Sequence, residues 1–129
     1  MSSFDYSRVK DPLYFREGRL DAHSDHVYYR GREDMISGKS EYTESLNGVW
    51  KFSYARNYES SVPGFEKEDC SCADWDDIRV PAHIQMEGYD APQYANTQYP
   101  WDGREDIRPG EIPEHFNPTA SYVKYFTVP

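Results

Sequence analysis

Hydrophobic and polar residues alternate most regularly just after Asn47-Gly48, a dipeptide typical of turns. Trp50, Phe52 and Tyr54 occupy every second position there, and smaller or polar residues separate them. A period of two with aromatic side chains on one side is typical of a β-strand with one buried face. This stretch is therefore the first element that the sequence predicts.

Two later stretches also carry a strand pattern. Residues 76–81 predict a short strand that turns Ile78 and Val80 inward and ends at its proline. Residues 121–128 are dense in strand-forming residues on both faces, so we expect them to pair with a central part of a sheet. The polar, turn-rich residues 56–74 predict a connection between strands.

Residues 1–43 show no sustained period and predict an extended N-terminal arm. A short helical turn is expected after Asp11-Pro12, where Asp can cap and Pro can take the first helical position. Residues 44–129 predict a β-rich domain with about three or four strands, whereas a sandwich needs about seven or eight to close both faces. We therefore expect this sequence either to be the front part of a longer protein or to borrow strands from a partner.

The composition describes a polar, acidic chain with enough aromatic residues to fold. Hydrophobic residues make up only 37% of the chain, and the mean hydropathy is −0.95. Aromatic residues make up 16% of the chain, however, and this content argues against disorder. The formal net charge of −9 opposes binding to nucleic acids or anionic membranes. No stretch approaches the roughly 20 apolar residues of a membrane span, and no secretory signal is visible, so we expect a cytoplasmic location.

Cys70 and Cys72 are predicted to be free thiols. A disulfide between residues two positions apart is strained, and two ligands do not make a zinc site. Free thiols also suit a reducing compartment.

Residues 80–100 are the most informative stretch of the chain. They combine three prolines, a glycine and several aromatic residues, and they follow neither a helical nor a strand period. Such a stretch predicts an ordered loop, and loops on a rigid scaffold are common ligand-binding sites.

The same stretch resembles the N-terminal domain of the large β-galactosidases of glycoside hydrolase family 2. Further matching segments follow the family's order and roughly its spacing: residues 19–26, 45–52, 113–114 and 117–119, and Tyr122. The resemblance covers most of residues 11–126. It implies a mainly β fold in which residues 44–129 form an incomplete sugar-binding domain, a partial jelly-roll β-sandwich, after the extended arm of residues 1–43.

Residues 94–100 match the family's Tyr-Thr-Asn-x-x-Tyr-Pro motif. The resemblance implies that Asn96 hydrogen-bonds galactose hydroxyls, since an amide both donates and accepts hydrogen bonds. Thr97 is carried over as a weaker substrate-binding residue, because the family commonly has an apolar residue there, and Ala95 departs from the usual Thr. The alternative is that Asn96 only stabilises a turn through its own backbone.

Three aromatic residues flank this motif or belong to it. Tyr94, Tyr99 and Trp101 either stack on the apolar face of a sugar or pack the loop onto its own sheet. The sequence leaves both interpretations open.

Two places in the arm invite a metal interpretation. His23 and His26 lack further ligands at a suitable spacing, and the resemblance implies a structural segment. In that segment we expect Arg19 and Asp25 to make charge-assisted hydrogen bonds. The family's magnesium near the start of the arm would find only Asp11 and a backbone carbonyl here. We therefore expect no metal site within this chain, although the resemblance implies magnesium and sodium in the full-length enzyme.

The chain carries no recognisable catalytic pair. A retaining glycosidase needs two carboxyl groups about 5–5.5 Å apart, and acidic residues such as Glu87, Asp90, Asp106 and Glu114 are interpreted as parts of a solvated charged surface. The resemblance implies that both catalytic glutamates lie in a separate barrel, so we expect no activity from this chain alone. The expected partners are a β-galactoside sugar and the remaining domains or subunits of a retaining β-galactosidase. Alternatives are a carbohydrate-binding module, a fragment that complements a partner enzyme, and a β-glucuronidase-like specificity.

Overall fold

The computed structural model describes residues 5–92, Asn96 and residues 101–128. The chain divides into two compact units, Met1–Tyr14 with Asn47–Pro129, and Phe15–Leu46. The predicted domain boundary between residues 43 and 44 stays a prediction. Within the described ranges, no helix is long and apolar enough to cross a membrane.

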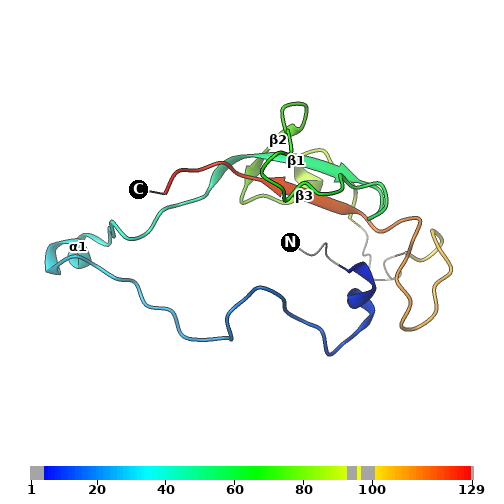
Figure 1. Ribbon diagram of the computed structural model, residues 1–129, viewed down its shortest axis with the longest axis horizontal. Helices are drawn as coiled ribbons and strands as arrows, with labels where there is room; N and C mark the ends of the chain where they lie inside the picture. Colours follow the sequence, from blue (N-terminus) through cyan, green and yellow to red (C-terminus); the bar gives the residue numbers. More distant parts are fainter. Residues whose placement is uncertain (1–4, 93–95, 97–100, 129) are drawn as a thin grey trace. The chain divides into compact units, whose positions relative to one another are not determined.

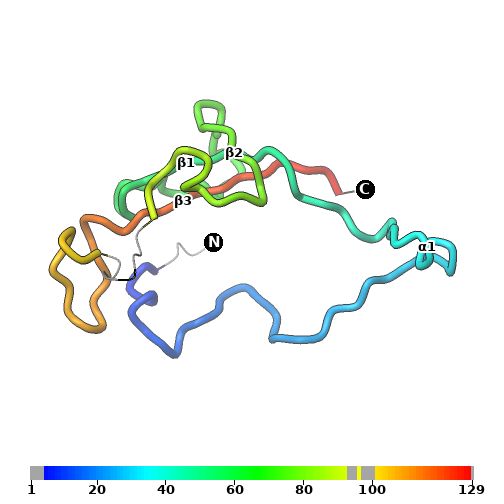
Figure 2. Tube along the Cα trace, turned by 180° about the vertical axis from the view of Figure 1, so that it is seen from behind, coloured from blue at the N-terminus to red at the C-terminus, as the bar shows by residue number. Residues whose placement is uncertain are grey.

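One antiparallel sheet of three strands organises the larger unit (Figure 1). The strands are β1 (Gly48–Ala55), β2 (Asp76–Val80) and β3 (Thr119–Val123), in the spatial order β2-β1-β3. The strands predicted after Asn47-Gly48 and near residues 76–81 are confirmed, and so is the mainly β fold class. Figure 2 shows the sheet from behind, with the chain leaving it for a long excursion between β2 and β3.

The two outer strands pair with different halves of β1. β2 lies opposite the first half, from Gly48 to Phe52, and β3 lies opposite the second half, from Lys51 to Ala55. Among the paired residues of β1, only Lys51 and Phe52 therefore have a neighbour on both sides. The two side chains point to opposite faces of the sheet: that of Phe52 is fully buried, with 0% exposure, whereas that of Lys51 is partly exposed.

The ring of Phe52 is the centre of the core. Tyr122 of β3 packs edge-on against it with 4.9 Å between ring centroids. Tyr89, which follows the short 3-10 helix η2 (Ile84–Met86), packs edge-on at 4.6 Å. Ile78 of β2 is also buried. Aromatic rings from three parts of the chain thus meet at one point, and each such pair contributes about 0.5–1.5 kcal/mol beyond its buried area.

β3 agrees with the prediction in its pairing and differs from it in its extent. It pairs with β1, the central strand of the sheet, and it covers Thr119–Val123, whereas the pattern predicts a strand over residues 121–128. After Val123, the Lys124 ammonium donates to the Val49 carbonyl at 2.9 Å, so a side chain takes an acceptor that a longer strand would use. The large apolar residues that follow are exposed: Tyr125, Phe126 and Val128. High strand propensity alone therefore does not extend the ladder.

The first described residues form a short 3-10 helix, η1 (Tyr6–Lys10). The Asp5 carboxylate caps it by accepting from the amide and the hydroxyl of Ser7, at 3.0 and 2.7 Å, and these bonds lower the pKa of Asp5. The ring of Tyr6 stacks on the ring of Tyr58 with 4.1 Å between centroids. This contact joins the start of the chain to the connection that follows β1.

The helical turn predicted after Asp11-Pro12 is a single tight turn instead. The Asp11 carboxylate accepts the N–H of Leu13 at 2.9 Å, and the Asp11 carbonyl accepts the N–H of Tyr14 at 3.0 Å. The aspartate side chain therefore stabilises the turn itself, as is common for this residue, and η1 ends just before it.

The unit Phe15–Leu46 contains one helix, α1 (Arg32–Ser37). The sequence pattern did not predict it, because six residues are too few to show a helical period. Gly38 ends the helix in the left-handed conformation, with φ of 69°. Large apolar side chains of this unit are exposed: Phe15, Leu20, Val27, Tyr28, Met35, Ile36 and Tyr42.

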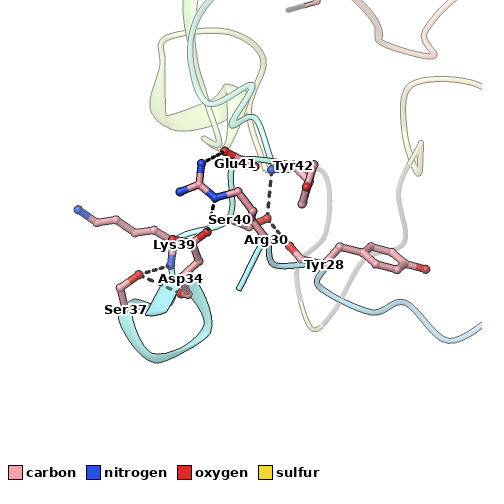
Figure 3. Close-up of polar contacts among 8 residues, drawn as sticks. All are labelled: Tyr28, Arg30, Asp34, Ser37, Lys39, Ser40, Glu41 and Tyr42. Carbon is pink, nitrogen blue, oxygen red and sulfur yellow. Dashed lines mark hydrogen bonds and ion pairs between the residues drawn. The ribbon is translucent and has the colours of Figure 1, made fainter. Parts of the chain in front are cut away.

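Polar contacts close the chain around α1 into a loop (Figure 3). The guanidinium of Arg30 forms ion pairs with Glu41 at 3.1 Å and with Asp34 at 3.7 Å. The hydroxyl of Ser40 donates to the carbonyl of Tyr28. This unit is therefore held by exposed polar contacts, which contribute little each, rather than by a hydrophobic core.

Replacement of Phe52 tests its central role. We expect Phe52→Ala to lower the free energy of unfolding by about 3–5 kcal/mol, because it leaves a cavity where both ladders meet. The control Val49→Ala removes an apolar side chain that is 56% exposed on the same strand, and its effect should stay below about 1 kcal/mol. Urea denaturation measures both values, and equal losses would contradict this view of the core.

Candidate functional site

Asn96, the predicted sugar-binding residue, lies in a turn and is exposed. Thr97, Ala95, Tyr94 and Tyr99 lie outside the described residues, so their predicted roles remain predictions. The chain is described again on both sides of this segment, up to residue 92 and from Trp101 onward.

The upstream side is anchored to the sheet through Tyr89. Its ring packs on Phe52, and its hydroxyl donates to the carboxylate of Asp76, at the start of β2, at 2.9 Å. This hydrogen bond, together with partial burial and the charge of Asp76, raises the pKa of Tyr89. The next residue, Asp90, contacts the hydroxyl of Tyr54, whose pKa is raised by burial and then by the Asp90 charge.

Two residues with left-handed backbones bracket the segment. Asp90 has φ of 56° and Trp101 has φ of 73°, and within the described ranges they are the non-glycine residues with positive φ. This conformation costs about 1–2 kcal/mol for a residue with a side chain. Such strain persists where the surrounding structure imposes it, and it gathers at functional sites.

The downstream side is anchored by Glu105. Its carboxylate accepts three backbone N–H groups, from Glu114 at 2.8 Å, His115 at 3.0 Å and Phe116 at 3.1 Å. The bond from the Glu114 amide is the largest reason why the pKa of Glu105 is lowered. The sequence offered no local signal for this contact, because the partners lie nine to eleven residues away.

The same region is tied to the end of β1. The Phe116 side chain is buried, and the guanidinium of Arg104 lies over its ring at 4.2 Å from the centroid. The amide of Asn117 donates to the carbonyl of Arg56 at 3.0 Å, and the Asn57 side chain donates to the carbonyl of Glu114 at 2.8 Å. The excursion between β2 and β3 thus returns to the sheet at a defined place.

Residues 101–111 line a hollow of about 940 Å³ that is open to solvent, just downstream of the predicted sugar-binding motif. At its upstream end the chain makes a turn, in which the Trp101 carbonyl accepts the N–H of Arg104 at 2.8 Å. At its far end, the Glu111 carboxylate accepts the N–H of Arg108 at 3.0 Å. The sequence analysis did not identify this hollow, because its shape depends on backbone turns.

The four acidic residues that were considered for a catalytic pair lie in different surroundings. Glu87 forms an ion pair with Arg79 at 2.8 Å, and Asp90 contacts Tyr54. The side chains of Asp106 and Glu114 are exposed. That the chain holds no catalytic pair stays a prediction.

The histidine segment of the arm is exposed and locally hydrogen-bonded. The His23 ring lies 2.7 Å from the Asp21 carbonyl and 3.1 Å from the Asp25 carboxylate. The guanidinium of Arg19 donates to the carbonyl of Phe15 at 3.5 Å.

Among the described residues, no three His, Cys, Asp or Glu side chains are grouped so that they could hold a metal ion. Asp11, at the place that matches the family's magnesium, accepts the Leu13 N–H with its carboxylate.

Cys70 and Cys72 are free thiols, as predicted. Cys72 is buried, and the phenol of Tyr125 is in hydrogen-bonding contact with it. Partial burial, followed by the neighbouring Cys72, raises the pKa of Cys70, which makes its thiol a weak nucleophile at neutral pH.

Residues 43–129 match the family described as the sugar binding domain of glycosyl hydrolases family 2. The chain belongs to glycosyl hydrolase family 2. It is 50% identical to the "Beta-galactosidase" of Halalkalibacterium halodurans over 95% of its own length and 12% of the relative's. It is 42% identical to the "Beta-galactosidase" of Streptococcus thermophilus, over 93% of the chain and 12% of the relative.

A third relative of this family 2 chain is the "Beta-galactosidase large subunit" of Latilactobacillus sakei, which is 37% identical over 89% of the chain and 20% of the relative. The chain thus spans between one eighth and one fifth of the length of these curated relatives, as the covered shares of 12% and 20% indicate. The family resemblance seen in the sequence is confirmed.

The Glu105 anchor predicts a pH dependence. Because its pKa is lowered in the folded protein, its stabilising contribution is complete above the ordinary value of 4.5 and is lost as the pH falls through the lowered value. We expect Glu105→Gln to melt at a lower temperature than the unaltered protein near neutral pH. In acid the two melting temperatures should converge, because Glu105 of the unaltered protein is then protonated and has lost its charge as well.

Melting curves between about pH 7 and pH 3 measure this difference. The control Glu59→Gln removes an exposed carboxylate from another loop and should show no such trend. A deficit for Glu105→Gln that stays constant with pH would rule out the charged anchor.

Proposed function

We propose that this chain is the N-terminal part of a retaining β-galactosidase that hydrolyses terminal β-D-galactosides such as lactose. Membership of family 2 and the printed names of the relatives support this activity. In this proposal the chain contributes a substrate-binding loop and subunit contacts, and the catalytic glutamates belong to another part of the enzyme.

The observation that carries the proposal is the way Asn96 is presented. Asn96 is exposed in a turn, and its segment is bracketed by the two strained residues Asp90 and Trp101. An amide that only stabilised its own turn would not require strain on both sides of the segment. Tyr89 and Glu105 anchor the described chain on the two sides of this segment.

The chemistry that we assign to this loop is recognition. The Asn96 amide donates to one sugar hydroxyl and accepts from another, and Thr97 adds a hydroxyl beside it. A ligand that lacks a matching hydroxyl leaves a buried polar group unpaired, which costs about 1–3 kcal/mol. Magnesium and sodium are proposed only for the whole enzyme, with ligands outside the described residues.

A second candidate function is that of a complementing fragment that docks on a partner enzyme. The exposed apolar side chains of the unit Phe15–Leu46 favour it, since such residues usually mark a surface that another protein covers. The two functions are compatible when the partner is the rest of the same enzyme. A free-standing carbohydrate-binding module has no comparable support.

Mutation of Asn96 in the full-length enzyme tests the sugar contact. We expect Asn96→Ala to lower kcat/KM for a chromogenic β-galactoside about 10- to 200-fold, because a hydrogen-bonding partner is lost. The control Gln85→Ala removes an exposed amide from the same excursion and should leave kcat/KM within about twofold. An unchanged kcat/KM in Asn96→Ala would show that Asn96 serves only its turn.

The 129-residue chain by itself is expected to be inactive, because in this proposal the catalytic glutamates belong to another part of the enzyme. Steady hydrolysis of a chromogenic β-galactoside by the purified chain would contradict the proposal. Calorimetric titration of the same chain with galactose separates the alternatives, since micromolar binding would indicate a carbohydrate-binding module. Restored activity on mixing with an N-terminally truncated relative would indicate a complementing fragment.

A further inference from the structure

Two thiols and a phenol from different parts of the chain meet in the larger unit. Cys70 and Cys72 belong to the connection between β1 and β2, whereas Tyr125 follows β3. The thiol of Cys70 is in hydrogen-bonding contact with that of Cys72, and the phenol of Tyr125 contacts Cys72 in the same way. The fold therefore brings a pair of free thiols together with a hydroxyl group.

Turns of the backbone hold both cysteines in place. The amide of Cys70 donates to the carbonyl of Lys67 at 3.1 Å, and the carbonyl of Cys72 accepts the N–H of Trp75 at 3.2 Å. The ring of Trp75 packs near the ring of Phe65, with 6.1 Å between centroids, so the loop that carries the thiols folds back on itself. The two sulfur atoms are thus ordered before a ligand arrives, which lowers the cost of binding.

The thiol pair is accessible although Cys72 is buried. Cys70 is only half-buried. Tyr125, whose phenol contacts Cys72, lines a second hollow of about 320 Å³ that is open to solvent and lies between residues 65–68 and residues 122–125. A binding site for an ion needs such an entry path.

The charges near the pair favour a cation. Asp69 and Glu66 both interact electrostatically with the thiol of Cys70. The charged residues that line the second hollow are two acidic and two basic ones, Glu66, Glu68, Lys67 and Lys124, so Asp69 leaves an acidic excess. Negative charges disfavour a bare thiolate, but a bound positive ion offsets them.

Two thiolates form a ligand set for a soft ion that accepts only two ligands. Zinc takes four ligands in structural sites, and magnesium and calcium prefer oxygen. Among the described residues no group of three His, Cys, Asp or Glu side chains could complete such a site. Copper(I) is soft and is selected by thiolates. A site with two ligands departs from the expectation that this chain holds no metal.

We propose that Cys70 and Cys72 bind one copper(I) ion between their sulfur atoms, with Tyr125 as a positioning residue. Each S–H bond breaks as an S–Cu bond forms, both protons pass to the solvent, and the oxidation state of copper does not change. The hydroxyl of Tyr125 then donates to the thiolate of Cys72 and orients it. The site does not depend on the proposed function, because it needs only the two sulfurs and their surroundings.

Competition for copper(I) with the chelator bicinchoninate, without oxygen and in the full-length enzyme, tests the site. We expect Cys70→Ser to bind one equivalent less than the unaltered enzyme, because a hydroxyl oxygen does not replace a soft thiolate. Cys72→Ala should lose the same equivalent without placing a new polar group at a buried position. The control Ser71→Ala changes the exposed residue between them and should keep Kd within about twofold.

Tyr125→Phe tests the positioning residue. We expect its Kd for copper(I) to rise about 10- to 100-fold, the usual effect of losing a hydrogen-bond partner of a metal ligand. Copper(I) should therefore raise the melting temperature of this variant less than that of the unaltered enzyme. A purely structural role would instead lower the melting temperature without copper and leave Kd unchanged, and would overturn the role of Tyr125.

Alkylation of the unaltered enzyme reports on the site without any substitution. Copper(I) should protect Cys70 from N-ethylmaleimide, as mass spectrometry of the peptide that carries it measures, and zinc(II) at the same concentration should not. This readout also decides the case in which Cys72→Ala does not fold. Copper equivalents unchanged in both cysteine variants, loss in only one of them, or equal protection by zinc(II) would each overturn the proposed site.

Discussion

The burial of Phe52 is the constraint on which the rest of the structure depends. β2 and β3 overlap on β1 only at Lys51 and Phe52, and of these two residues Phe52 has the fully buried side chain. Tyr122 from β3 and Tyr89 from the excursion between the strands both pack on it. The ring therefore joins segments that are separated by up to 70 residues of chain, as the positions of Phe52 and Tyr122 show.

This arrangement gives the excursion between β2 and β3 two fixed ends. Tyr89 ties its start to the core, and the Glu105 carboxylate gathers three amides near its return to the sheet. A segment held at both ends can keep strained residues such as Asp90 and Trp101, because unfolding them would disturb the anchors as well. A loop of this kind on a sheet can present side chains to a ligand with little loss of order.

The two sides of the candidate site were predictable to different degrees. Asn96 was predicted from its motif, because a motif is a local pattern that can be read without knowledge of the fold, and its role stays a prediction. Glu105 was not identified, since its carboxylate acts on amides nine to eleven residues away and no spacing rule links them. Trp101 was recognised only as an aromatic residue near the motif, because its left-handed backbone is a property of the folded turn.

The sequence by itself determined the existence and the buried face of β1, because alternation of side chains is built into the strand backbone. It also determined the family and the acidic, aromatic character of the chain. Only the tertiary structure decided that β1 is central, that β3 is an edge strand ending at Val123, and that both meet at Phe52. The reason is that strand neighbours, strand ends and carboxylate anchors depend on hydrogen-bonding partners far away in sequence, which no local pattern encodes.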